Sequence, residues 1–304
     1  MRDPAHVKVL ATRRLPGPAF DVLEAEVVPP GGLERPREDV EALIVANEPV
    51  PLELLPRLRL VANFGVGYDR IDLAACAARG VVVTNTPGVL DDAVADLALA
   101  LILAVRRRVV EGDQLVRSGA WADSWVGGKL AEELSGSTLG LVGLGRIGSA
   151  VARRAVGFDL RVLFTRRSGG ASEFGEHRSL DELLAESDVV SIHVPLTAET
   201  ERLLDARRLA LLRDGACLVN TARGEIVDEQ ALVAELVSGR LRAGLDVFAH
   251  EPHVPPELLG LPNVVLTPHI ASATRQTREA MTRLVVDNVL AVERGEPPLT
   301  PVSS

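Results

Sequence analysis

The sequence is poor in aromatic residues and in cysteine, and both shortages limit what the protein can be. Aromatic residues make up 3% of the chain while hydrophobic residues make up 47%, so its cores must be built from Ala, Val and Leu, which suits layered α/β structure. The cysteines, Cys76 and Cys217, lie far apart in apolar surroundings and match no metal-ligand spacing. We therefore expect buried free thiols and no metal site.

Basic charge and long apolar runs are scarce as well. The chain has 33 lysine and arginine residues against 42 aspartates and glutamates, and its net charge of -9 argues against general binding to nucleic acid or to an anionic membrane. Only Lys8 and Lys129 are lysines, so a single arginine is weak evidence for function. The longest apolar run, 97–105, is too short to span a bilayer, and the N-terminal stretch does not resemble a signal peptide. We expect a cytoplasmic protein.

Two series of strand and helix patterns follow one another along the 304 residues. The first has strand patterns at 7–10, 42–45, 58–64 and 81–83 and helical patterns at 18–26 and 71–79. Turn residues at 84–88 precede one long predicted helix, 91–117, and the second series places strands at 139–142, 161–164, 189–193, 216–220, 243–247 and 264–267. A last helix, 272–294, would return to the first series. The pattern predicts an α/β protein with two doubly wound parallel-sheet domains, the first of them discontinuous.

A glycine-rich turn separates the first strand of the second series from a helix predicted over 149–155. Its residues are Gly143, Leu144, Gly145, Arg146, Ile147 and Gly148. In a dinucleotide-binding turn of this spacing, the first glycine permits a tight bend, the second lets the backbone approach a pyrophosphate, and the third lets the helix pack on the strand. The helix N-terminus adds unpaired N–H groups for the phosphates. The alternative is a turn without a ligand, but the flanking strand and helix favour a dinucleotide.

The end of the next strand bears on which dinucleotide is bound. NAD sites usually carry an Asp or Glu about 20 residues beyond the glycine turn, where it binds the ribose 2′-hydroxyl. Here the strand ends in Thr165, Arg166 and Arg167, so the carboxylate is missing and two guanidiniums suited to a 2′-phosphate take its place. The sequence favours NADP(H). NAD(H) stays the alternative, because both arginines could simply face solvent.

Three later segments each place a chemically active side chain just past a strand. Arg223 follows strand 216–220, Glu251 follows strand 243–247, and His269 follows strand 264–267. Because the carboxyl ends of parallel strands face one crevice in a doubly wound sheet, these side chains can converge there. Each alone has an ordinary explanation, as a capping arginine, a solvated glutamate or a structural histidine. Together, after a dinucleotide turn, they indicate an active site.

The chain resembles the D-isomer-specific 2-hydroxyacid dehydrogenase family over essentially its whole length. Residues 63–72 are similar to the substrate-carboxylate loop of that family, and 83–87 and 94–96 to its interdomain crossing. Residues 193–197, 199–200 and 220–224 are similar to its cofactor-domain signatures. The resemblance implies a Rossmann cofactor domain, 91–273, inserted in a flavodoxin-like substrate domain made of 1–90 plus 274–304.

The resemblance also implies a catalytic set of Arg223, Glu251 and His269. Reduction of a 2-keto acid needs hydride on the carbonyl carbon and a proton on its oxygen, and His269 is the expected general acid because imidazole titrates near neutrality. Glu251 would orient the imidazole, and Arg223 would bind the substrate carboxylate with its forked donors. The N–H groups of Val66 and Gly67 would complete the carboxylate site.

The expected cofactor site combines the glycine turn, the strand end after it and the family signatures that follow. Asp246 in particular would lie near the nicotinamide carboxamide. The full set is Gly143, Gly145, Arg146, Ile147, Gly148, Thr165, Arg166, Arg167, His193, Pro195, Thr200, Thr221, Ala222, Asp246 and His269.

The 64–68 loop and the NADP-type strand end are most similar to glyoxylate/hydroxypyruvate reductases within the family. We therefore expect NADPH-dependent reduction of glyoxylate or hydroxypyruvate to the D-2-hydroxy acid. The alternatives are reduction of a bulkier or D-lactate-type 2-keto acid, and a non-catalytic module that senses the dinucleotide. Trp121 and Trp125 either line the substrate site or pack their loop against a dimer surface, and we expect a homodimer.

Overall fold

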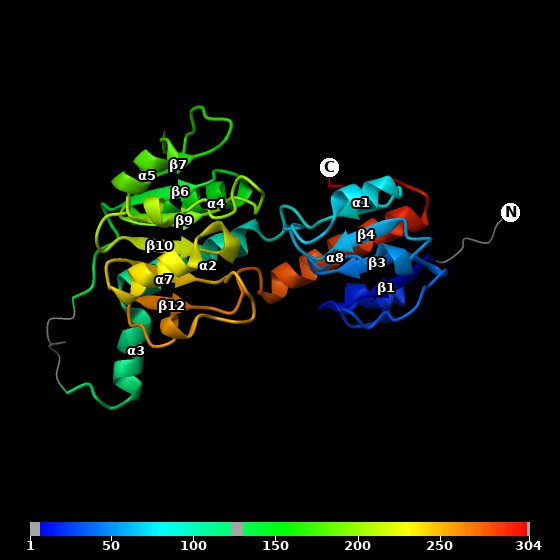
Figure 1. Cartoon of the computed structure of the whole chain (residues 1–304), viewed down its shortest axis with the longest axis horizontal. Coiled ribbons are helices and arrows are strands. Elements are labelled where there is room, and N and C mark those ends of the chain that lie inside the picture. The colour runs from blue at the N-terminus through cyan, green and yellow to red at the C-terminus, as the bar shows by residue number, and fades with distance from the viewer. Residues whose placement is uncertain (1–6, 123–129, 303–304) are drawn as a thin grey trace. The chain divides into compact units, whose positions relative to one another are not determined.

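The structure is a computed structural model that describes residues 7–122 and 130–302. The chain divides into two compact units, one made of Met1–Leu90 with Ser272–Ser304 and the other of Asp91–Ala271 (Figure 1). We call them unit 1 and unit 2. Each unit has its own parallel sheet, which confirms the expected α/β class.

Unit 1 is built on a five-stranded sheet of order β2-β1-β3-β4-β5, in which every pairing is parallel. This order corresponds to the flavodoxin-like winding. Strand β4 is buried along its whole length, as expected for a strand covered on both faces. The last helix, α8, packs against β4. The elements are β1 (Lys8–Ala11), η1 (Pro18–Leu23), β2 (Glu26–Val27), β3 (Val40–Val45), η2 (Leu52–Leu54), β4 (Leu60–Asn63), α1 (Leu73–Ala78), β5 (Val82–Thr84) and α8 (Arg275–Glu293).

Unit 2 is built on a seven-stranded sheet of order β12-β11-β10-β9-β6-β7-β8, again with parallel pairings throughout. Counted from β6, the order is the Rossmann winding with one further strand. The elements are α2 (Asp91–Arg106), α3 (Val109–Arg117), β6 (Thr138–Val142), α4 (Arg146–Ala155), η3 (Val156–Phe158), β7 (Arg161–Thr165), β8 (Glu176–His177), α5 (Leu180–Glu186), β9 (Val189–Ile192), α6 (Ala206–Leu209), β10 (Cys217–Asn220), η4 (Gly224–Ile226), α7 (Glu229–Val237), β11 (Arg242–Leu245), η5 (Pro256–Leu258) and β12 (Val264–Leu266).

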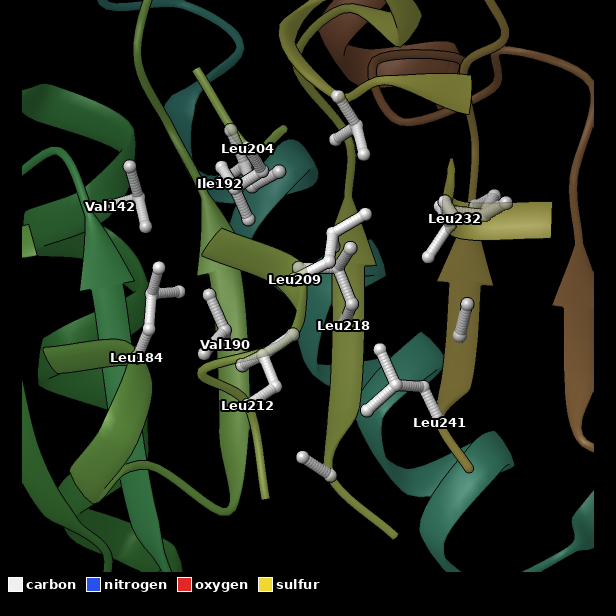
Figure 2. Close-up of a cluster of buried hydrophobic side chains, with 14 of the residues drawn as sticks. Val142, Leu184, Val190, Ile192, Leu204, Leu209, Leu212, Leu218, Leu232 and Leu241 are labelled. Carbon is white, nitrogen blue, oxygen red and sulfur yellow. The ribbon is translucent and has the colours of Figure 1, made fainter. Parts of the chain in front are cut away.

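The unit 2 sheet separates two apolar cores. Alternate residues of β10 point to opposite sides, with Leu218 in one core and Cys217 and Val219 in the other. The Leu218 core is completed by α5, α6 and α7, and Figure 2 shows Leu184, Leu209 and other leucines meeting the strand residues there. Helices α2 and α4 cover the other face with alanine, valine and leucine. Packing on both faces fixes the strands, and so fixes where the loops after them begin.

Helix 91–117 was predicted as one element and is two. Helix α2 ends at Arg106 and α3 begins at Val109, because Arg108 takes the left-handed conformation with φ 54. Arg106 is buried, and its guanidinium donates to the Glu133 carbonyl and to Ser137 Oγ. The turn therefore follows a tertiary contact that helical periodicity does not show.

The prediction of a helix over 18–26 was wrong in its last three residues. Only Pro18–Leu23 is helical, as a 3-10 helix, and Glu24 ends it with φ 46. Glu26–Val27 instead forms the short edge strand β2, and β8 is a second edge strand that the sequence pattern missed. Both are two residues long, too short for an alternation to show. Among the described helices, none has the length and apolarity needed to cross a membrane.

Candidate active site

The candidate site residues of unit 2 lie just past the carboxyl ends of neighbouring strands. The glycine turn follows β6, His193 follows β9, and Arg223 follows β10. Asp246 and His269 follow β11 and β12. Since these five strands are adjacent in the sheet, their carboxyl ends form one continuous edge. This edge includes the point between β6 and β9 where the winding reverses, which is where open α/β sheets bind ligands.

Glu251 and His269 form a hydrogen-bonded pair at this edge. His269 Nδ1 and Glu251 Oε2 are 2.8 Å apart, and Glu251 Oε1 accepts the Phe248 N–H at 3.2 Å. Burial alone would raise the pKa of Glu251, but the hydrogen bond and charge of His269, the Phe248 N–H and the charge of Arg223 lower it overall. Glu251 is therefore ionised near neutral pH. It holds Nδ1 and leaves Nε2 of the partly exposed ring available for proton transfer.

A buried carboxylate holds the segment that carries His269. Asp246 is fully buried, and its Oδ1 accepts from Thr267 Oγ1 at 2.6 Å and from the Ile270 N–H at 2.9 Å. Its Oδ2 accepts the Ala271 N–H at 2.9 Å. The main-chain carbonyl of the same aspartate accepts the His269 N–H at 2.8 Å. One residue thus fixes the chain on both sides of the histidine.

His269 needs this support because its backbone is left-handed, with φ 52. That conformation costs a residue with a Cβ roughly 1–2 kcal/mol and persists where neighbouring contacts over-determine it. The hydrogen bonds from Asp246 are such contacts. The sequence predicts that Asp246 also lies near the nicotinamide carboxamide, and this stays a prediction. Its described contacts make it a positioning residue for His269, a role that sequence reasoning did not identify.

Arg223 lies in a turn that Asn220 closes. Asn220 Oδ1 accepts the Ala222 N–H at 3.0 Å, and Asn220 Nδ2 donates to the Arg223 carbonyl at 2.7 Å. Arg223 Nη1 donates to the Ala222 carbonyl at 2.7 Å. A Cβ at Gly224 would come within 2.0 Å of the Phe248 carbonyl carbon, so only glycine lets this turn approach the segment that leads to Glu251. The structure therefore brings Arg223, Glu251 and His269 together on one edge.

The glycine turn has the close approaches that its spacing predicts. Gly143 has φ 102, and a Cβ there would lie 2.7 Å from the His193 carbonyl oxygen. A Cβ at Gly148 would lie 2.2 Å from the Gly143 carbonyl oxygen, so α4 packs directly on the turn. Gly145 by contrast faces open space, since nothing lies within 4 Å of its Cβ position. The backbone is thus accessible at the one position where a pyrophosphate must approach it.

The N-terminus of α4 offers donors beside that open space. Gly145 is the N-cap residue and provides no side-chain cap, and the first helical bond runs from the Ser149 N–H to the Gly145 carbonyl at 2.9 Å. The N–H groups of Arg146, Ile147 and Gly148 precede that bond. Together with the open face of Gly145, they fit a dinucleotide phosphate.

The other expected cofactor residues lie after β9 and β10. Thr221 Oγ1 is buried without a hydrogen-bond partner among the described residues, as expected of a group that a ligand would satisfy. His193 Nε2 is 2.9 Å from Ser191 Oγ, and burial lowers the pKa of His193 to about 4, so its ring is neutral near pH 7. Thr200 Oγ1 accepts the Thr197 N–H at 2.8 Å and donates to the Pro195 carbonyl at 2.6 Å, which closes the loop after β9.

The two arginines after β7 differ in availability. Arg166 donates to the carbonyls of Gly169 and Ala171 at 2.5 and 3.0 Å, and its guanidinium lies 5.4 Å from the centroid of the Phe164 ring. Arg167 is 84% exposed, and its Nη2 is 3.5 Å from Glu199 Oε2. A carboxylate therefore does lie near the end of β7, but it comes from the loop after β9. Arg166 is thus engaged in shaping its own loop, while Arg167 is accessible to a ligand.

Val66 and Gly67 lie in unit 1, in the loop after β4. Asn63 Nδ2 donates to the carbonyls of Gly65 and Gly67 at 3.1 and 2.8 Å, and Asn85 Nδ2 donates to the Val66 carbonyl at 2.9 Å. Within the described chain, neither the Val66 nor the Gly67 N–H donates to another group. The two asparagines thus bind the carbonyls and leave the N–H groups available for an anion. Sequence reasoning missed their role, because only the folded loop shows which groups they contact.

The structure describes one of the two tryptophans, Trp121, and its expected role stays a prediction. Trp121 is 56% exposed. Trp125 lies outside the described residues, so its expected role stays a prediction.

Replacing Asp246 with asparagine tests its positioning role. Asparagine presents an NH2 group where the aspartate oxygen accepts, so a buried N–H loses its partner. We expect a loss of about 1–3 kcal/mol in the free energy of unfolding, measured by urea denaturation, with faster amide exchange at Ile270 and Ala271. Asp214→Asn is the control, because Asp214 is 89% exposed and should change stability by less than about 0.5 kcal/mol. Equal stability and exchange in both variants would contradict the role.

Comparison with known proteins agrees with this geometry. Residues 99–271 match the family model described as D-isomer specific 2-hydroxyacid dehydrogenase, NAD binding domain. Curated glyoxylate reductases from Pyrococcus furiosus and Thermococcus litoralis are 47% and 46% identical, over 97% and 96% of this chain and 95% of each relative.

Solved structures agree over nearly the whole chain. A protein of Thermus thermophilus superposes with a TM-score of 0.92 at 46% identity, covering 98% of this chain and 100% of that one. The NADPH-dependent glyoxylate/hydroxypyruvate reductase of Sinorhizobium meliloti, solved with NADP and malonate, gives a TM-score of 0.91 at 37% identity, covering 98% and 97%. The chain therefore belongs to the D-isomer-specific 2-hydroxyacid dehydrogenase family, as an oxidoreductase that uses a nicotinamide dinucleotide.

Proposed function

We propose that the protein reduces glyoxylate or hydroxypyruvate to the corresponding D-2-hydroxy acid, with NADPH preferred as reductant. The observation that carries the proposal is the 2.8 Å contact between Glu251 and His269 at the edge that also holds Arg223 and the glycine turn. The glyoxylate reductases at 46–47% identity support the choice of a short keto acid. The alternatives to this proposal are reduction of a bulkier 2-keto acid and non-catalytic sensing of the dinucleotide.

In this proposal each residue acts on one part of the substrate. A bound nicotinamide supplies the hydride for the carbonyl carbon. His269 donates a proton from Nε2 to the carbonyl oxygen, and ionised Glu251 keeps the ring oriented through Nδ1. Arg223 binds the substrate carboxylate with its forked donors, and the N–H groups of Val66 and Gly67 are donors for the same carboxylate.

Steady-state assays with glyoxylate, hydroxypyruvate and pyruvate, each with NADPH and NADH, test the reaction. We expect NADPH oxidation with the first two and a loss of about 10²-fold or more in turnover for His269→Ala, because the proton donor is removed. His253→Ala is the control, since His253 is an exposed histidine in the neighbouring loop. If none of the 2-keto acids supports NADPH oxidation by the wild-type chain, the enzyme hypothesis is rejected in favour of the dinucleotide sensor. Near-normal turnover of His269→Ala would remove that residue from the acid role.

The NADPH preference rests on the chemistry at the end of β7. The strand offers Thr165, Arg166 and Arg167 where an NAD site would offer a carboxylate. The exposed Arg167 is the better candidate for direct contact with a 2′-phosphate, because Nε and Nη2 of Arg166 already donate to backbone carbonyls. Exchange of the weak Glu199 contact for a phosphate would give Arg167 a stronger, charge-assisted partner.

Arg167→Ala tests this assignment. A charge-assisted hydrogen bond contributes about 1.5–3 kcal/mol, so the Kd for NADPH should rise by roughly 10- to 100-fold while the Kd for NADH changes little. Fluorescence titration of both cofactors measures this. Arg153→Ala is the control, because Arg153 is 56% exposed near the other end of α4. Equal losses for both cofactors would overturn the preference.

We also propose that the protein is a homodimer and that α3 lies in the interface. This nine-residue helix has no buried residue, although a helix so short is marginal in water without packing. It exposes Val109, Val110 and Val116, by 54%, 40% and 57%, close in the chain to the exposed Trp121 and Leu130. A second copy of this chain would cover these apolar groups.

Light scattering after size-exclusion chromatography tests the dimer. We expect twice the chain mass of 32.4 kDa, and a shift toward monomer for Val116→Arg, because a charge at an apolar interface is left unpaired. Val237→Arg is the control, since Val237 is equally exposed, at 56%, at the end of α7. A wild-type monomer, or a Val116→Arg variant that remains dimeric, would contradict the proposed interface.

A further inference from the structure

Unit 1 carries a second group of charged side chains at the carboxyl edge of its sheet. Arg13 follows β1, Glu48 follows β3, Phe64 follows β4, and Arg278 lies in the first turns of α8. Strands β1 and β3 are neighbours, and in the order 2-1-3-4-5 they flank the point where the winding reverses. Ligands of open α/β sheets bind outside the carboxyl ends at such a point. The cluster therefore has the location of a binding site.

Arg278 is the unusual member. Its guanidinium carbon lies 5.4 Å from the centroid of the buried Phe64 ring, the geometry of a cation–π contact. Among the residues that the structure describes, no carboxylate pairs with the Arg278 guanidinium and no acceptor binds it. Burial first, and then the like charge of Arg13, lower the pKa of Arg278, although an arginine remains protonated throughout the ordinary pH range.

The charges of this cluster do not balance. Glu48 forms an ion pair with Arg13, and its second oxygen, Oε2, is buried without a partner in the described chain. The cluster thus has two guanidiniums and one carboxylate, and because Glu48 pairs with Arg13, the charge of Arg278 is unmatched among the described residues. A partly buried cation without a counter-ion is costly, so a stable arrangement of this kind is expected where a ligand supplies the negative charge.

The adjacent loop has the complementary donors. Phe64, on which Arg278 stacks, directly precedes the loop in which the Val66 and Gly67 N–H groups are available. We propose that Arg278, with Arg13, is the cationic part of an anion-binding site on unit 1, which attracts the carboxylate of a 2-keto acid to the Val66 and Gly67 N–H groups. The substrate class rests on the proposed function. Arg278 thus determines substrate affinity, while the hydride and proton steps depend on unit 2.

Oxalate is a suitable probe, because it is a small carboxylate that cannot be reduced by hydride transfer to a keto group. Isothermal titration of the full chain saturated with NADPH would compare wild type, Arg278→Gln, Arg278→Lys and Arg275→Gln. We expect the Kd for oxalate to rise about tenfold in Arg278→Gln and less in Arg278→Lys, which keeps the charge. Arg275→Gln is the matched control, because Arg275 is exposed one turn earlier on α8 and should leave the Kd unchanged.

Kinetics and salt dependence complete the test. In Arg278→Gln the KM for glyoxylate should rise in parallel with the oxalate Kd, while kcat changes less than about twofold, as for loss of uniform binding. In wild type the oxalate Kd should weaken as ionic strength rises, and this dependence should flatten in Arg278→Gln. If that variant does not fold, Arg278→Lys and the wild-type salt dependence decide the question.

The outcomes separate this proposal from the proposed function. If oxalate binding depends on Arg278 but the chain reduces no 2-keto acid, the anion site is supported and the proposed reductase activity is contradicted. If the chain reduces glyoxylate but the oxalate Kd is the same in Arg278→Gln and Arg275→Gln, the reductase activity is supported and the anion site is overturned. A wild-type chain that does not bind oxalate would also overturn it.

Discussion

The buried carboxylate of Asp246 is the interaction on which the candidate active site depends. It binds Thr267, Ile270 and Ala271 at 2.6–2.9 Å and so holds the segment that carries His269 in its left-handed conformation. Without this carboxylate the left-handed conformation would lose the hydrogen bonds that offset its cost, and the position of Nδ1 beside Glu251 would no longer be fixed. A charge in the core is expensive unless it is fully hydrogen-bonded, and here three donors satisfy it. The structure thus uses a buried charge to fix an exposed reactive group.

The same principle recurs wherever the backbone must be held for a ligand. Asn63 and Asn85 bind the carbonyls of the 65–67 loop and leave its N–H groups available, and Asn220 closes the turn before Arg223. In each case a short amide side chain replaces the hydrogen bonds that a helix or sheet would provide. Loops built in this way present main-chain donors or side chains rigidly, although they lie outside regular structure.

Much of this arrangement could be predicted from local sequence. The alternating strands and helices follow from apolar periodicity, and the glycine turn follows from its spacing, because close approach excludes a Cβ at Gly143 and Gly148. The positions of Arg223, Glu251 and His269 after strands also follow, since parallel strands end at one edge. The edge strands β2 and β8 and the break at Arg108 could not be predicted. They arise from contacts across the fold, where two paired residues or one buried arginine are enough to change the local structure.

The sequence by itself therefore determined the fold class, the kind of cofactor and the residue types that the chemistry needs, because each can be read from strands, turns and the residues that directly follow them. The tertiary structure decided which groups hold those residues in place. Asp246 binds the backbone around His269. Arg166 donates to its own loop, while Arg167 stays accessible. Arg278 stacks on Phe64 without an acidic partner in the described chain. These outcomes depend on distances between residues far apart in the chain, and only folding sets such distances.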